Sequence, residues 1–299
     1  MNVRAADEVP GPARRIDVHH HIYPKSYLAK AEQGVRGIAH AFYPELEKWT
    51  PQRAIGDMDR DGVAVSLLSI SAPGIWFGDA VAARALSRDC NEHGARLAHD
   101  HASRFGHLAA LPLPDIDGSL REIEYAFDVL NADGICLMSN YDDVWLGDAS
   151  FAPVFDELER RSAVVLVHPV VASFVAGMRA ELPAATIEFP FDTTRAIASL
   201  LYGGTATRCP NVRFIFSHGG GAMPMLVGRL LGLEYYRKDL AARIPGGARD
   251  ALSKLYFDVV SVTNAGGFAA LRRSIASLSS VLRSRAANSF AVTLAGRNG

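Results

Sequence analysis

The residues of this chain best suited to chemistry are histidines at the ends of short apolar runs. His19 and His21 flank His20 at the end of the first such run, and His168 and His218 close two later ones. Side chains alternate between the two faces of a strand, so His19 and His21 point the same way and His20 points opposite. Two imidazoles at one strand end can bind a single divalent cation. This spacing predicts a mononuclear metal site.

His168 is the candidate for the third ligand. It follows the apolar run 163–167, which is typical of a buried parallel strand, and Pro169 then ends that strand. A histidine whose hydrogen bonds are satisfied inside the core remains the alternative interpretation. We expect the metal ligands to be His19, His21 and His168.

His218 ends the run 212–217 and is followed by three glycines, 219–221. A glycine run lets backbone approach a ligand closely. His218 could be a fourth ligand, a catalytic base or a packing histidine. The base is favoured, because an imidazole with a pKa of ~6.5 can move protons at neutral pH.

The remaining histidines are not expected to bind metal. His99 and His101 have the same spacing as His19 and His21, but they lie in a segment with a helical pattern. Residues two apart on a helix diverge by ~200° around its axis, so these two cannot share an ion. We interpret them, with His93 and His107, as surface or packing residues, and nothing assigns a role to His40.

Short β-rich runs alternate with helical patterns along the chain, which predicts parallel βαβ units. The pattern favours an α/β fold, a (β/α)8 TIM barrel whose eighth strand is weak or missing. A doubly wound sheet also fits the alternation, but no glycine-rich dinucleotide loop follows the first strand. The expected strands are 15–19, 63–70, 105–111, 134–138, 164–168, 212–217 and 255–259. The expected helices are 53–61, 80–103, 119–130, 151–161, 193–206 and 223–240.

The chain has 299 residues, enough for one large α/β domain or two smaller ones, and a complete barrel of ~250 residues commonly forms a single domain. We expect a flexible N-terminus over 1–14 and the barrel over 15–273. A small insertion over 23–52 would lie above the catalytic mouth, and residues 274–299 form an atypical tail.

Composition excludes several classes of function. The net charge is −1 and the hydrophobic content is 49%, with no basic stripe before the tail, so no nucleic-acid partner is expected. The apolar runs are too short to span a bilayer, so no membrane association is expected. Three widely separated cysteines do not form a disulfide framework, which favours a reducing cytoplasm.

Several segments together resemble the amidohydrolase-related metal-dependent decarboxylases, which include aminocarboxymuconate-semialdehyde decarboxylase and 6-methylsalicylate decarboxylase. The likeness runs from about residue 15 to about residue 273, and the triple histidine and FPFDTTR resemble the 6-methylsalicylate branch most. The matching segments are IDVHHHIYP (16–24), ALPLPD (110–115), SNYDDVWLGD (139–148), FAPVFDELERR (151–161), VVLVHP (164–169), FPFDTTRA (189–196), FIFSHGGGAMP (214–224) and LYFD (255–258).

The resemblance implies a carboxy-lyase that uses a divalent metal, with zinc expected and manganese the alternative, to act on a small aromatic or muconate-like carboxylic acid. It implies His19, His21 and His168 as ligands and His218 as a base or polarising group. It also implies a homodimer in which Arg229 contacts the substrate carboxylate across the interface, although a surface salt bridge is an equal interpretation of Arg229.

Three other residues near the family motifs receive weaker interpretations. Arg53 lies one position out of register with another substrate arginine of the family. Asp192 and Arg195 are expected to be structural partners in a loop.

The C-terminal region departs from the family pattern. Relatives carry an aspartate ligand after an eighth strand, whereas no Asp or Glu follows Asp258 here. The Ser-, Ala- and Arg-rich tail resembles an out-of-frame translation that ends early. Asp258 could replace the missing ligand or have a structural role. A lactone or amide hydrolase and a non-catalytic, degenerate family member therefore remain alternatives to the decarboxylase.

Overall fold

The computed structural model describes residues 15–39, 46, 48–177, 182–262 and 264–274. The N-terminus 1–14 and the tail beyond residue 274 lie outside the described residues, as do 40–45 and 47 of the expected insertion.

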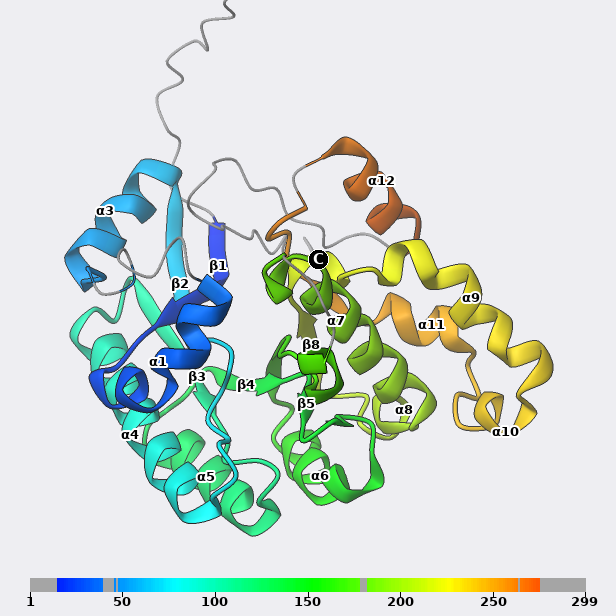
Figure 1. The fold of residues 1–299 in the computed structure, drawn as a ribbon, viewed down its shortest axis with the longest axis horizontal. Coiled ribbons are helices and arrows are strands. Elements are labelled where there is room, and N and C mark those ends of the chain that lie inside the picture. The colour runs from blue at the N-terminus through cyan, green and yellow to red at the C-terminus, as the bar shows by residue number, and fades with distance from the viewer. Residues whose placement is uncertain (1–14, 40–45, 47, 178–181, 263, 275–299) are drawn as a thin grey trace, which may run out of the picture.

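Seven parallel strands form one sheet in which neighbours follow chain order (Figure 1). A separate antiparallel pair follows the fourth of these strands along the chain. The seven strands are β1 (Arg15–Ile22), β2 (Val63–Ile70), β3 (Phe105–Ala110), β4 (Gly134–Met138), β7 (Val164–His168), β8 (Arg213–Phe216) and β9 (Tyr256–Phe257). The short pair consists of β5 (Asn140–Tyr141) and β6 (Val144–Trp145).

Helices connect the strands and lie around the outside of the sheet (Figure 1). Parallel strands require such crossovers, since each strand must return to the same edge before the next begins. The α-helices are α1 (Lys25–Ala39), α3 (Pro51–Asp61), α4 (Ala80–Asp100), α5 (Ile116–Asp128), α6 (Ala152–Arg160), α7 (Ala184–Tyr202), α8 (Thr205–Arg208), α9 (Met223–Tyr236), α10 (Lys238–Ala241), α11 (Ala248–Ser253) and α12 (Ala265–Ser274). Single 3₁₀ turns are η1 (Ala149–Phe151), η2 (Ser173–Gly177) and η3 (His218–Gly220).

The sheet curls into an almost complete barrel. β1 and β9 stand at opposite ends of the strand order, yet Asp258, directly after β9, lies 2.6 Å from a ring nitrogen of His19 on β1. Only a curled sheet brings its two edges this close. Within the described residues no strand pairs between β9 and β1. The prediction of an α/β barrel fold is therefore confirmed, and the seven paired strands of the described residues are consistent with a weak or missing eighth strand.

Buried strands build the core next to the site. β3, β4 and β7 are almost wholly buried, as expected for strands covered on both faces. Local signals set the helix ends as well. Thr50 caps α3 by accepting the N–H of Arg53 at 3.2 Å, and Gly62 ends the same helix in the left-handed region at φ 66°.

The structure corrects the expectation that Asp192 and Arg195 lie in a loop. Both residues lie inside α7, which begins at Ala184 and contains Pro190 within its length. A proline in a helix interior removes one hydrogen bond, so the sequence predicted the helix start too late. The two side chains are partners, with Arg195 Nη1 3.8 Å from Asp192 Oδ1.

The segment after β1 is largely helical. Helix α1 covers most of the first half of the expected insertion, and α3 begins at its end. α1 starts three residues after β1 ends and therefore leaves the same edge of the sheet as His21. Across the described ranges, every helix is too short or too polar to cross a membrane.

Candidate metal centre

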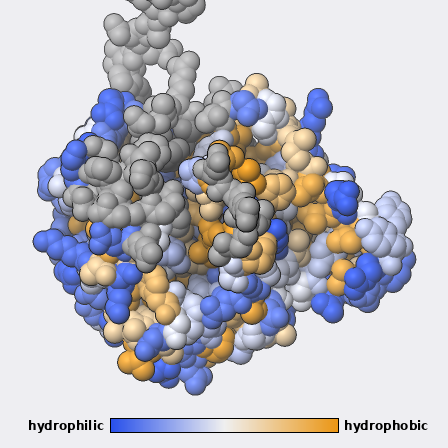
Figure 2. Space-filling model, in the orientation of Figure 1, coloured by the Kyte–Doolittle hydropathy of each residue, from blue (hydrophilic) through white to orange (hydrophobic). Residues whose placement is uncertain are grey.

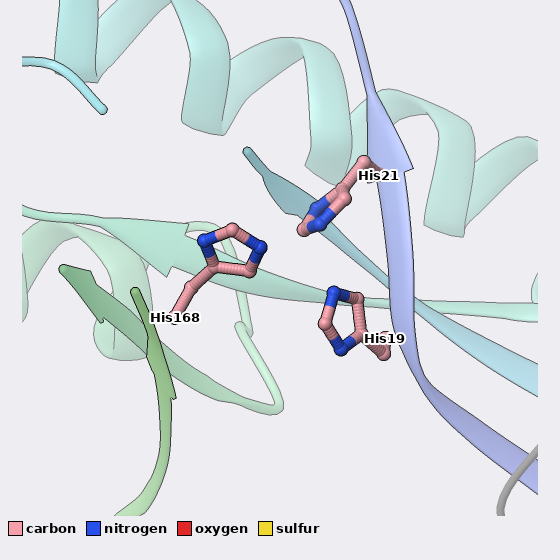
Figure 3. A group of neighbouring side chains, drawn as sticks. All are labelled: His19, His21 and His168. Carbon is pink, nitrogen blue, oxygen red and sulfur yellow. The ribbon is translucent and has the colours of Figure 1, made fainter. Parts of the chain in front are cut away.

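Three imidazoles converge from two strands that are far apart in the sequence (Figure 3). His19 and His21 come from β1 and His168 from the end of β7, and one nitrogen of each lies within 4.8 Å of the other two. The ring centroids are 4.7 Å apart for His19 and His21, 5.1 Å for His19 and His168, and 4.7 Å for His21 and His168. Nitrogens at such distances can surround one cation with small side-chain movements.

The outer nitrogens of His168 and His21 are already engaged. His168 Nδ1 lies 2.8 Å from the carbonyl oxygen of Pro169, an acceptor, so Nδ1 carries the proton and Nε2 keeps its lone pair. His21 Nδ1 lies 3.1 Å from Ser69 Oγ on β2. A partner on one ring nitrogen fixes the tautomer and ring orientation that a metal ligand requires.

His19 has the same arrangement with a stronger partner. Its Nδ1 lies 2.6 Å from Oδ2 of Asp258, whose side chain is fully buried. The other oxygen of Asp258 accepts the backbone N–H of Val260 at 3.0 Å and that of Gly219 at 3.4 Å. The carboxylate thus contacts the outer nitrogen of His19 and is not part of the three-histidine group. This placement supports the structural role of Asp258 over the replacement-ligand role.

Burial keeps His21 and His168 uncharged. The pKa values of His21 and His168 lie well below the usual imidazole value, chiefly because both side chains are buried. The neighbouring imidazoles lower both pKa values further. Neutral imidazoles are the form that binds metal.

His218 is the fourth imidazole at the centre. Its ring centroid is 5.1 Å from that of His19 and 5.8 Å from that of His168. Burial first, and then the neighbouring His19, lowers the pKa of His218 to about 4. Its Nδ1 is buried and has no hydrogen-bond partner within the described residues. The backbone of His218 is left-handed, at φ 56°, an uncommon conformation for a residue with a side chain.

The glycines after His218 pack against protein rather than lining open space. A Cβ on Gly219 would meet Val262, one on Gly220 would meet Phe257, and one on Gly221 would meet the carbonyl of Pro190. All three glycines have positive φ. The run therefore permits a tight left-handed turn that aims His218 at the other imidazoles.

The sequence predicts no role at the centre for Phe189, and it indicates Asp192 only as a structural partner of Arg195. Phe189 on α7 packs its ring 5.8 Å from His168 and 6.2 Å from His218, forming an aromatic wall. Asp192, one turn later on α7, accepts hydrogen bonds from residues that follow β4. Residues 189 and 192 are three apart on α7 and lie on the same side of it, but the sequence predicted a helix only from residue 193, so this spacing gave no signal.

The arginines lie apart from the histidines. Arg229 is exposed on α9 and Arg53 is exposed on α3, so neither belongs to the group within this chain. Of the other histidines, His20 points away as predicted and accepts the indole N–H of Trp49 at 3.1 Å.

The histidines that were not expected to bind metal also lie outside the group. His99 is exposed at the end of α4, and His107 is buried on β3. His40 lies outside the described residues.

Comparison with known proteins agrees with this geometry. The amidohydrolase family model matches residues 16–257. Decarboxylase macB of Penicillium terrestre is 36% identical over 263 residues, covering 84% of this chain and 77% of that protein. The 6-methylsalicylic acid decarboxylase of Penicillium expansum is 35% identical over 219 residues, covering 72% of this chain and 67% of that protein.

A solved structure shares the fold. That structure is 5-carboxyvanillate decarboxylase from Novosphingobium aromaticivorans, complexed with manganese and 4-hydroxy-3-methoxy-5-nitrobenzoic acid. It superposes with a TM-score of 0.78 at 21% identity, covering 88% of this chain and 83% of that one. The chain therefore belongs to the amidohydrolase family, and its relatives there are decarboxylases.

Proposed function

We propose that this protein is a metal-dependent decarboxylase that releases carbon dioxide from an aromatic carboxylic acid. The observation that carries the proposal is the convergence of His19, His21 and His168, each with its Nδ1 engaged and its Nε2 available. The decarboxylase relatives favour this reaction over the hydrolysis of a lactone or amide, for which the same histidines would activate water.

The residues present fit a divalent ion. His21 Nε2 is buried and lacks a hydrogen-bond partner within the described residues, which is costly unless a ligand satisfies it. We propose His19, His21 and His168 as ligands, with zinc the expected ion because three imidazoles suit it. Manganese is the alternative, because imidazole accepts both ions and the related carboxyvanillate decarboxylase binds manganese. When bound, such an ion supplies a Lewis acid that polarises a substrate oxygen.

His218 is the proposed catalytic base. With a pKa of about 4 it is neutral at pH 7, so one ring nitrogen can accept a hydrogen bond from substrate and polarise it. The lowered pKa makes His218 a weaker base than a free imidazole, so a polarising role is the alternative to proton transfer. Its unpartnered Nδ1 and its position beside His19 and His168 support this proposal.

An aromatic substrate fits the surroundings. The ring of Phe189 contacts both His168 and His218 and supplies an apolar wall beside the proposed ion. Two relatives are named for 6-methylsalicylic acid, and another for a carboxymuconate semialdehyde, so a hydroxybenzoate is the preferred class and a muconate-like acid the alternative.

We further propose a homodimer in which Arg229 meets the substrate carboxylate of the other copy. On the face of the molecule drawn in Figure 2, apolar residues gather where α7 and α9 lie. Exposed apolar side chains on these helices include Ile187, Phe191 and Met225. Arg229 lies exposed on the same α9, and a guanidinium is well shaped to bind a carboxylate.

We place the protein in the cytoplasm and treat 15–273 as one catalytic unit, with 23–52 as its insertion. The support for a reducing compartment is that Cys90, Cys136 and Cys209 are all free and buried. The family match over 16–257 supports a single unit.

The test combines metal analysis with product analysis. The protein, loaded with zinc or with manganese, is incubated with 6-methylsalicylate and related hydroxybenzoates, and carbon dioxide is measured. We expect the parent protein to bind one ion per chain and to release carbon dioxide. His168→Ala should lose the bound ion and the activity, whereas the control His99→Ala should retain both. Ring opening of a lactone without decarboxylation would indicate the hydrolase, and a parent chain without metal would indicate a non-catalytic family member.

A further inference from the structure

The strand end that carries His168 is held by a buried hydrogen-bond network. The network is centred on Asp192 of α7, whose side chain is 1% exposed. Asp192 Oδ2 accepts the hydroxyl of Ser139 and, at 2.9 Å, the amide of Asn140, while Oδ1 accepts the indole N–H of Trp145 at 3.0 Å. All three donors lie in the segment that follows β4.

Two of these donors also contact the segment that begins with His168. The backbone N–H of Ser139 donates to the carbonyl of His168 at 2.8 Å. The hydroxyl of Ser139 accepts the N–H of Val170 at 2.9 Å, so its own hydrogen is the one given to Asp192. Asn140 is within 3.5 Å of the carbonyl of Val170. The residues on both sides of Pro169 are thereby fixed.

We infer that Asp192 is a positioning residue for the metal ligand His168, acting through Ser139. The inference rests on the proposed function, because it concerns the ion that His168 would help to hold. His168 Nδ1 is bound to the carbonyl of Pro169, so the direction of its free Nε2 depends on the backbone between His168 and Val170. That backbone is the one that the network fixes. An ion held by three imidazoles tolerates little misplacement of any of them.

The chain offers a matched control for a buried carboxylate. Glu122 on α5 is 4% exposed and accepts the amide of Asn91 at 2.8 Å. Asn91 in turn donates to the carbonyl of Ala110 at 2.9 Å and accepts its N–H at 2.8 Å. Glu122 thus holds the end of β3, which carries none of the three proposed ligands.

The experiment compares Asp192→Asn with Glu122→Gln. Zinc affinity is measured by competition with a chromogenic chelator, Co²⁺ absorption reports coordination geometry, and the unfolding midpoint of the metal-free protein is recorded for each. We expect Asp192→Asn to weaken zinc binding by about 10–100-fold and to alter the Co²⁺ spectrum. Glu122→Gln should lower the unfolding midpoint but keep the affinity and spectrum of the parent.

Equal affinities in Asp192→Asn and the parent would overturn the inference, as would an equal loss in Glu122→Gln. If Asp192→Asn does not fold, Ser139→Ala removes one member of the same network. It should weaken zinc binding by about tenfold, and unchanged binding would again overturn the inference. A parent chain that binds no zinc would instead overturn the proposed function.

Discussion

The carboxylate of Asp258, directly after the last strand of the sheet, lies 2.6 Å from Nδ1 of His19 on the first strand. This contact joins the two edges of an open barrel and engages the outer nitrogen of a proposed metal ligand. Carboxylate–histidine–metal arrangements of this kind raise the basicity of the ligand and fix its ring. The same carboxylate accepts the N–H of Gly219, so it also positions the turn that presents His218.

Replacing Asp258 with asparagine tests this role. Asp258→Asn removes the negative charge beside His19 while keeping the shape of the side chain, so zinc affinity should fall by about 10–100-fold. Chelator competition measures the change. Asp133→Asn is the control, because Asp133 accepts the backbone N–H of His107, a strand histidine outside the metal group. Unchanged affinity in Asp258→Asn would show that the contact is purely structural.

The two pairs of histidines with identical spacing give a second prediction. Substituting both His19 and His21 with alanine should leave less than about a tenth of an equivalent of zinc, because only one ligand of three remains. Substituting both His99 and His101 should leave zinc content at the parental level, since His99 is exposed at the end of a helix. Metal analysis of the purified variants measures both. Equal zinc content in the two double variants would contradict the assignment.

Much of the fold follows from local patterns in the sequence. β2, β4 and β7 match their predicted bounds, because each is a compact apolar run between clear breaks. The start of α7 was placed too late because Pro190 inside the helix resembles a helix break. β9 is shorter than predicted, since an apolar run alone does not fix where pairing ends.

The site was predictable to the extent that it depends on strand ends. Strand alternation was enough to pair His19 with His21, and parallel topology was enough to add His168. The contact of Asp258 with His19 joins residues 239 positions apart and depends on the curl of the sheet. No local pattern encodes that distance. The network around Asp192 was missed for the same reason.

The buried histidines predict how stability of the metal-free protein depends on pH. His218 has a folded pKa of about 4, below the value of ~6.5 expected when unfolded, so the unfolded state binds more protons between these values. Stability is therefore full above pH ~6.5 and falls as the pH is lowered. Protonation of His218 alone should lower the free energy of unfolding at pH 5 by about 2 kcal/mol relative to pH 8. The pKa values of His21 and His168 are also lowered, so both add to the loss.

Urea unfolding of the metal-free protein between pH 8 and pH 5 measures this dependence. His218→Gln removes one titrating group and should reduce the loss between pH 8 and pH 5 by about 2 kcal/mol. His99→Ala, at an exposed position, should leave the pH dependence as it is in the parent. A flat stability profile across this range would show that the imidazoles are not buried in the neutral form.

Gly221 gives the last prediction, because its position forbids a side chain in two independent ways. Its φ is +65°, and an added Cβ would collide with the carbonyl of Pro190 on α7. Gly221→Ala should lower the free energy of unfolding by at least about 2 kcal/mol and displace the turn that carries His218. Gly56→Ala is the control, since a Cβ at Gly56 on α3 meets nothing within 4 Å. That change should stabilise the helix by about 0.5–1 kcal/mol. Denaturant unfolding measures both variants, and equal stability of the two would contradict the tight packing of the glycine turn against α7.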